Sequence, residues 1–367
     1  MSYFDFDERN QRSSSRHTEW VCLLVFVVFT FVYLYFYQSD VLAAGQHVLS
    51  GGQTHYRRLV GAVLITLVLL ILQRFIFHLT QLRKRAHALT YLPSLLVLTV
   101  ITDVSSNIDL GFSFGGWLIA VPLIAVGYGF LVVLLRKMEP FEPQSTGSGF
   151  LSRTSWINLL TMVVMFILVG LFSNGDTAFH YHMRMERLLL DGKNKEALRV
   201  GRKSEVTDPS LTMLRAYALA REGQLGNRFF EFPVTESTAS LLPDGKKARV
   251  VIMPDSLITI LSRKAGVRAD YRLIQLLTDR RLNEFAALVR KAYPDSLMPK
   301  HYAEAVAMHH RLATNDSIDV VDSVMMQSYD EFCMKEKSTP KASLQSVMRK
   351  TYGRTYWYYY KYGWKDN

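Results

Sequence analysis

The chain has 367 residues, with 43 Lys and Arg against 32 Asp and Glu, and 49% of its residues are hydrophobic. This length accommodates two units of ordinary domain size, and two cysteines are too few for a disulfide framework. The bases of residues 176–367 are interspersed with acids, which is typical of solvated helix faces, so we expect no nucleic-acid partner.

Long, nearly uncharged runs in residues 1–175 predict membrane-spanning helices. A helix needs about 20 apolar residues to cross ~30 Å of hydrocarbon. Four runs approach or exceed this length: Trp20–Tyr37, Leu59–Leu79, Leu110–Leu135 and Thr154–Ser173. We interpret the first as a retained helix, because the head that precedes it is too acidic for a signal peptide. A fifth run, Leu89–Thr102, has 14 residues and spans only if its helix continues past Asp103 toward Ile108.

The basic residues between these runs predict how the helices are oriented. The segments Arg74–His87 and Arg136–Arg153 carry four and three Lys or Arg and are therefore expected in the cytoplasm. Two successive loops on one side require an even number of crossings between them, so Leu89–Thr102 must cross the membrane and Leu110–Leu135 must return. Four bases oppose this scheme from the outer side: Arg57, Arg58, Arg184 and Arg187.

The resulting expectation is an all-α chain in a plasma (inner) membrane. Residues 1–19 form a cytoplasmic tail, and residues 20–175 form a transmembrane bundle of five helices, or four if Leu89–Thr102 does not cross. Residues 176–367 form an extracytoplasmic, soluble, helical-repeat-like domain.

Apolar residues at three- and four-residue spacing predict amphipathic helices in the second half. These are Phe179–Leu190, Lys195–Lys203, Ser210–Glu222, Tyr271–Thr278, Leu282–Ala292 and Lys300–Leu312. Between the two sets, the stretch 229–255 is rich in Pro, Gly, Ser and Thr, and it contains one β-like run, Val250–Met253. We therefore expect an irregular connector there.

The second half resembles the tetratricopeptide repeat. Small residues stand where paired helices would touch, in Ala197, Tyr217-Ala218-Leu219-Ala220 and Gly223-Gln224-Leu225, and Pro209 follows Ala197 by twelve residues. The whole arrangement is similar to an uncharacterised family of bacterial multi-pass membrane proteins with a tetratricopeptide-like C-terminal half. The stretches that carry this likeness are 223–231, 299–305 and 352–360. It implies an architecture and no activity.

Histidine and carboxylate pairs were considered as metal ligands. Asp176 and His180 stand four residues apart and share a helix face, whereas His180 and His182 point ~200° apart. His301 and Glu304 are one turn apart, but a di-iron carboxylate site needs such a pair twice. We therefore predict no metal, no cofactor and no catalytic residue.

Carboxylates in the outer loops supply the alternative of a membrane enzyme. Asp40, Asp103 and Asp109 follow predicted spans on the outer side, where enzymes that use lipid-linked sugars place an acid that binds metal or activates an acceptor. The glycines of Gly115–Ala120 and Gly127–Leu131 form no phosphate loop, and we expect them to permit close helix contact.

The C-terminal segment Tyr352–Trp364 holds six Tyr and two Trp. At helical spacing Tyr352, Tyr356 and Tyr360 form one stripe, with Trp357 and Trp364 on another. Packing of these rings against the preceding helices is the interpretation we favour, because end repeats need capping. The alternative is a ligand or partner surface formed by Tyr356, Trp357, Tyr360 and Trp364.

Without catalytic motifs, the sequence favours a membrane-anchored binding or scaffold protein. Its expected partners are the lipid bilayer and another protein, which the helical-repeat domain would bind. The alternatives are a glycosyltransferase-like enzyme acting on a lipid-linked or envelope substrate, or a subunit of a transport complex.

The orientation is directly testable. A reporter that works only outside the cytoplasm should be active when it is fused after Asn367, because both basic loops are expected inside. Paired reporters that require either compartment make the measurement. Activity of the cytoplasmic reporter alone would contradict the orientation, and it would reduce Leu89–Thr102 to a re-entrant segment.

Overall fold

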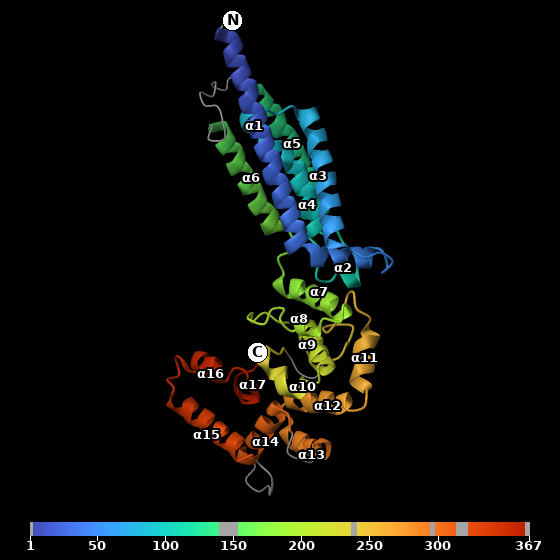
Figure 1. Ribbon diagram of the computed structural model, residues 1–367, viewed down its shortest axis with the longest axis vertical. Helices are drawn as coiled ribbons and strands as arrows, with labels where there is room; N and C mark the ends of the chain where they lie inside the picture. The colour runs from blue at the N-terminus through green and yellow to red at the C-terminus, as the bar shows by residue number, and fades with distance from the viewer. Residues whose placement is uncertain (1–2, 139–152, 236–240, 294–297, 313–321, 364–367) are drawn as a thin grey trace. The chain divides into compact units, whose positions relative to one another are not determined.

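A computed structural model describes residues 3–138, 153–235, 241–293, 298–312 and 322–363, with the backbone alone for residues 3–16. The chain divides into two compact units, Met1–Asp176 and Thr177–Asn367. Within the described ranges every regular element is a helix (Figure 1). The all-helical prediction is therefore confirmed.

The first unit contains five helical segments that are long and apolar enough to cross a membrane: His17–Tyr37, Arg58–Thr80, Lys84–Thr102, Trp117–Met138 and Arg153–Phe172. Its helices are α1 (Tyr3–Val32), α2 (Ser39–Leu49), α3 (Arg58–Thr80), α4 (Leu92–Thr102), α5 (Trp117–Met138) and α6 (Arg153–Phe172). A π-helical turn, Tyr33–Tyr37, extends α1, and a 3-10 segment, Lys84–Tyr91, precedes α4. The described residues thus contain five helical segments with the length and composition of membrane spans, the larger of the two numbers that the sequence predicted.

The short predicted run Leu89–Thr102 reaches membrane length by extension at its N-terminal end, not past Asp103. Its helix ends at Thr102 instead of continuing past Asp103, and the added length comes from the 3-10 segment Lys84–Tyr91 on the other side. Asn158 of α6 satisfies that irregular backbone: its Oδ1 accepts from the Ala88 N–H at 2.7 Å, and its Nδ2 donates to the Lys84 carbonyl at 2.8 Å. Backbone groups within a bilayer require such partners, because no water replaces them.

The third predicted span is shorter than expected. Helix α5 begins at Trp117, whereas Leu110–Gly116 lies outside it. Gly115 has a φ of 51°, in the left-handed region that favours glycine and interrupts a helix. A Cβ added at Gly127 or Gly129 would meet nothing within 4 Å. Among the described residues no other helix therefore lies close to Gly127 or Gly129, and the expected close helix contact is not made there.

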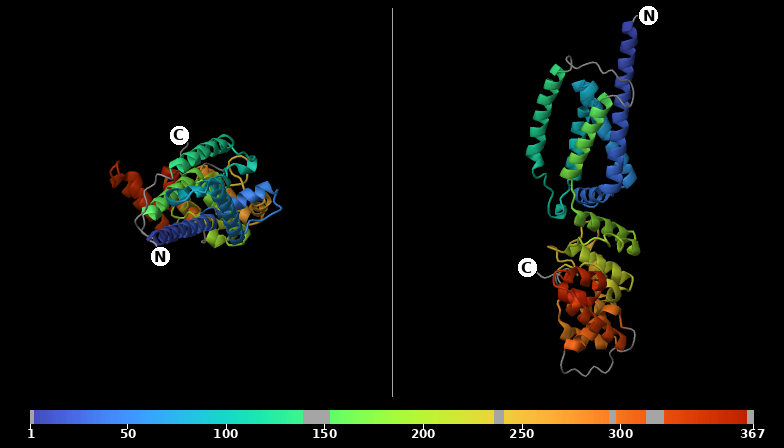
Figure 2. Two further views of the ribbon diagram at one scale, coloured as in Figure 1. Left: turned by 90° about the horizontal axis from the view of Figure 1, so that it is seen from above. Right: turned by 90° about the vertical axis from the view of Figure 1, so that its left-hand side faces the viewer.

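The core of the first unit lies among α1, α3, α4 and α6, which run side by side (Figures 1 and 2). Phe29 and Phe166 stack with ring centroids 3.8 Å apart, and Phe26 lies 4.9 Å from Tyr91. Buried polar side chains find partners between helices, as Gln73 Nε2 donates to Thr90 Oγ1 at 3.0 Å. Helix α5 stands at the edge of the bundle, and only 6% of its most apolar 18-residue stretch is buried.

The second unit consists of short helices joined by turns. Its helices are α7 (Thr177–Leu190), α8 (Asn194–Ala197), α9 (Pro209–Arg221), α10 (Leu225–Arg228), α11 (Asp255–Arg263), α12 (Val267–Thr278), α13 (Leu282–Ala292), α14 (Lys300–Leu312), α15 (Ser323–Ser338), α16 (Leu344–Tyr352) and α17 (Tyr356–Tyr362). The predicted helix Lys195–Lys203 is wrong beyond Ala197. Gly201 has a φ of 61° there, and the Tyr181 ring occupies the place of a Cβ, at 2.7 Å.

The connector after α10 is irregular but anchored. The predicted β-like run Val250–Met253 is no strand, because its backbone turns around the buried carboxylate of Glu186 on α7. The Glu186 oxygens accept from the N–H groups of Val251, Ile252 and Met253 at 2.8, 2.6 and 2.9 Å. His182 Nε2 lies 2.6 Å from the same carboxylate. A side chain thus supplies the hydrogen bonds that a neighbouring strand would supply in a sheet.

Arg215 ties the start of this connector to α9. Its side chain is buried, and Nη1 donates to Thr207 Oγ1 at 2.9 Å and to the Pro233 carbonyl at 3.3 Å. The guanidinium also lies 5.6 Å from the centre of the Phe232 ring. Burial lowers the pKa of Arg215 to about 10, so the group remains charged at neutral pH.

Candidate functional site

The first unit has a cavity of about 1410 Å³. It lies between α2, the segment 103–116 and the first turn of α5. Apolar walls come from Ile65, Val100, Ile101 and Ala120 of the spans, and from Phe172 at the end of α6. Polar groups line it as well: Gln46, Ser50, Asp103, Ser105, Ser106, Ser113, Ser173, Asn174 and Asp176. Apolar and polar side chains thus both line the cavity.

The segment 103–116 is held over this cavity by side-chain contacts. Trp117 Nε1 donates to Asp103 Oδ2 at 2.7 Å. Asn174 binds the same segment, because its Nδ2 donates to the Val104 carbonyl and its N–H to the Thr102 carbonyl. These contacts join the ends of α4, α5 and α6 around one hollow.

The three outer-loop carboxylates do not share a site. Asp103 lines the cavity, whereas Asp40 and Asp109 do not. Asp40 is 7% exposed, and its Oδ1 lies 2.8 Å from Nη2 of Arg58. A buried carboxylate so paired stabilises the junction of α2 and α3, and its charge is already balanced. Asp109 lies in the short 3-10 turn Ile108–Leu110.

The histidine pairs likewise form no metal centre. Within the described part of the chain, no group of three His, Cys, Asp or Glu side chains is placed to hold a metal ion. His182 lies against Glu186, and His301 Nδ1 lies 2.9 Å from Glu304 Oε2. Both pairs are buried within the second unit, and both carboxylates also accept from backbone N–H groups.

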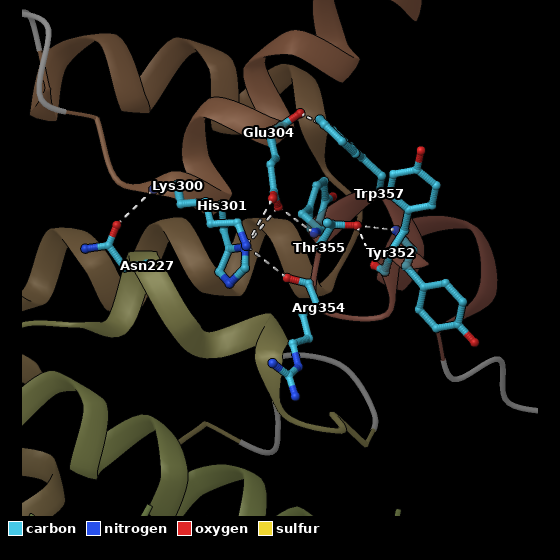
Figure 3. A network of polar contacts seen from close by, with 10 residues as sticks. Asn227, Lys300, His301, Glu304, Tyr352, Arg354, Thr355 and Trp357 are labelled. Atoms are coloured by element: carbon cyan, nitrogen blue, oxygen red, sulfur yellow. Dashed lines mark hydrogen bonds and ion pairs between the residues drawn. The ribbon is translucent and has the colours of Figure 1, made fainter. Parts of the chain in front are cut away.

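Glu304 is the centre of a buried network (Figure 3). Its Oε2 accepts from the Tyr356 N–H at 2.7 Å, and its backbone carbonyl accepts from Trp357 Nε1 at 2.6 Å. His301 binds the same carboxylate, and Lys300 Nζ lies 3.7 Å from Oε1. One residue of α14 therefore holds the first turn of α17.

The aromatic tail divides between the core and the surface. Tyr356 and Trp357 are 0% and 2% exposed, so both rings are packed in the core. Tyr360 is partly exposed, whereas Trp364 lies outside the described residues. Burial raises the pKa of Tyr359 to about 12 and holds that of Tyr356 well above its usual value, so both phenols are neutral at physiological pH.

Tyr360 lines a second hollow, of about 550 Å³, on the second unit. The other lining residues are Arg280, Arg281, Leu282, Asn283, Glu284, His309 and Leu312. Arg281 is paired with Glu284, and His309 Nε2 lies 3.0 Å from Asn283 Oδ1. Arg280 instead lies 5.8 Å from the centre of the Tyr360 ring and donates to the Gly363 carbonyl at 3.5 Å. Neither of these two partners carries a charge.

The backbone at Arg280 is in a conformation that favours glycine. Its φ is 59°, and it follows α12 in a Schellman turn, with the Arg280 N–H on the Leu277 carbonyl and the Arg281 N–H on Leu276. A side chain there costs roughly 1 kcal/mol relative to glycine. Such strain is found preferentially at functional positions. Sequence reasoning missed Arg280; the available signal was a base at a helix end where glycine is usual.

Part of the second unit is similar to a protein family without an assigned activity. The model of a family of unknown function (DUF6057) matches residues 263–363. This segment includes α12 to α17, the Glu304 network and the Arg280 hollow. No curated protein and no solved structure matches the chain.

Substitution of Asp40 tests whether the outer carboxylates are catalytic. Asp40→Ala should lower the stability of the full chain by about 1–3 kcal/mol, because it leaves Arg58 without its partner. Thermal unfolding in detergent measures this, with Asp191→Ala, at a side chain 53% exposed on the second unit, as a control that should stay within ~0.5 kcal/mol. A stable Asp40→Ala protein that has nonetheless lost its cellular phenotype would favour the enzyme.

Substitution of Trp357 tests the packing of the tail. Trp357→Ala should destabilise the isolated residues 177–367 by about 3–5 kcal/mol, through the lost burial and the orphaned Glu304 carbonyl. Urea unfolding gives the midpoint, and Met334→Ala, at a position 61% exposed, serves as the control. Equal midpoints for the two variants would mean that the ring is not in the core.

Proposed function

We propose that this membrane protein is an anchored binding protein, whose second unit recognises an acidic group of a protein partner. The observation that carries the proposal is Arg280: a cation beside an aromatic wall, in a hollow, on a strained backbone. The hollow belongs to the segment that the family model matches. We identify no catalytic residue in it.

The chemistry of the hollow favours a carboxylate ligand. Glu284 offsets the charge of Arg281, which leaves Arg280 to attract an anion. A guanidinium binds carboxylates in a planar, bidentate geometry. The ring of Tyr360 supplies an apolar wall for the rest of the ligand, such as the side chain that precedes an acidic residue. A segment of a partner that ends in, or contains, Asp or Glu fits this description.

The proposal includes a tetratricopeptide-like organisation of the second unit, on the extracytoplasmic side. Small buried residues at helix contacts support the first part, since a Cβ at Gly226 would lie 2.7 Å from the Tyr302 ring, and Ala218 is fully buried. The basic segments Arg74–His87 and Arg136–Arg153 support the second. A repeat domain on that side would bind an envelope component or another membrane protein.

A membrane enzyme acting on a lipid-linked substrate is the second candidate. One observation favours it, because Asp103 and Asp176 both line the cavity of the first unit. A catalytic carboxylate has to reach a substrate in this way. Asp40 is less suited to the role, because it is buried in a pair with Arg58.

Site-specific crosslinking tests the binding proposal. A photoreactive phenylalanine replaces Tyr360 in the full chain, and native membranes are irradiated. A discrete protein adduct should form, and its yield should fall about tenfold with Arg280→Gly, the effect of losing one charge-assisted hydrogen bond. The same photoreactive residue at Met334, on α15 and away from the hollow, should not give that adduct.

The Arg280→Gly variant separates binding from folding. Glycine relieves the left-handed backbone at this turn, so the unfolding midpoint of the second unit should stay the same or rise. Loss of the adduct at an unchanged midpoint supports the proposal. The proposal is overturned if the chain with the photoreactive residue at position 360 and an intact Arg280 forms no adduct. It is also overturned if the adduct yield does not depend on Arg280.

A further inference from the structure

The cavity of the first unit has the features of a site for an amphipathic molecule. Its volume of about 1410 Å³ exceeds the ~300–1,000 Å³ of ordinary small-molecule pockets. Ile65, Ile101 and Ala120 of three different spans form part of its apolar wall. Asp103 and Ser105 are among its polar lining residues. A lipid can contact both kinds of residue, with an acyl chain and a polar head.

Trp117 and Ala120 of α5 line the cavity, and most of this helix is not buried within the unit. Two sets of polar contacts hold this helix: Trp117 binds Asp103 at its start, and Arg136 near its end binds the carbonyls of Leu79 and Thr80. Between them α5 is exposed on most sides, and Val132 is its one buried residue among those described. Hydrocarbon can therefore reach the cavity along α5, which gives an acyl chain a path of entry.

The charges around the cavity restrict the head group. Among the described residues that line it, none is Lys, Arg or His, whereas Asp103 and Asp176 are both present. A phosphate would meet the carboxylate of Asp103 without a cation among the described lining residues, which is unfavourable in a partly desolvated site. Carboxylates, Ser hydroxyls and the Gln46 amide instead accept and donate hydrogen bonds to hydroxyl groups.

We propose that this cavity binds a lipid whose head is uncharged and rich in hydroxyls, the chemistry of a glycolipid. The acyl chain lies along Ile65, Ile101 and Ala120, and the head meets Asp103 and the serines of the segment 103–116. The site is independent of the Arg280 hollow, which lies in the other unit. Binding at the cavity requires no reaction of the lipid.

Native mass spectrometry of the full chain tests this site. The protein is purified in a polyoxyethylene detergent, since an alkyl glycoside would itself compete, and is then mixed with glucosyl diacylglycerol or with phosphatidylglycerol of the same acyl chains. The glucosyl lipid should be retained roughly tenfold more than the anionic lipid, a difference of about one hydrogen bond. Equal retention, a preference for the anionic lipid, or retention of neither overturns the proposal.

Cavity-filling variants locate the bound lipid. Ala120→Trp places an indole in the cavity and should reduce retention of the glucosyl lipid by roughly tenfold. Gly127→Trp is the matched control, because Gly127 lies on the same helix, outside the cavity, with open space around it. Leu49→Trp, on the opposite wall at a position 62% exposed, replaces Ala120→Trp if that variant does not fold. Equal retention by the filling variant and Gly127→Trp overturns the assignment.

Discussion

Backbone groups that lie away from water and outside regular helices need a partner, and three polar side chains supply several of those partners here. In the membrane unit Asn158 binds the 3-10 segment before α4. In the second unit Glu186 gathers three N–H groups of the connector, and Glu304 holds the first turn of α17. An unsatisfied buried group costs about 1–3 kcal/mol, so each side chain decides whether an irregular segment is ordered.

This constraint also explains which carboxylates remain for function. Glu186 and Glu304 are buried and occupied by backbone donors, and Asp40 is occupied by Arg58. Charged groups also line the two hollows: Arg280, Arg281 and Glu284 in the second unit, and Asp103 and Asp176 in the first. The two hollows differ in character, since one presents a cation beside an aromatic ring and the other presents carboxylates beside an apolar wall. The opposite signs suit different ligands.

The binding role that we propose draws on two of these features. The Arg280 backbone is strained in a way that a glycine would relieve, yet the side chain there has neutral partners only among those described. The cavity of the first unit is lined by carboxylates, Ser hydroxyls and apolar side chains of the candidate spans. A protein that holds a lipid in the bilayer and a partner outside it would couple the two through one chain.

The sequence by itself determined the class of the protein and most of its helices. The spans at α3 and α6, and the helices α13 and α14, follow from apolar runs and from the 3.6-residue period, because hydropathy and periodicity are local properties. Tertiary structure decided the remainder. Val250–Met253 has the composition of a strand, but Glu186, more than sixty residues earlier, binds its N–H groups. The burial of Trp357 depends on Glu304, and the exposure of Arg280 depends on how α12 meets α13. Such contacts join residues distant along the chain, so no local pattern contains them.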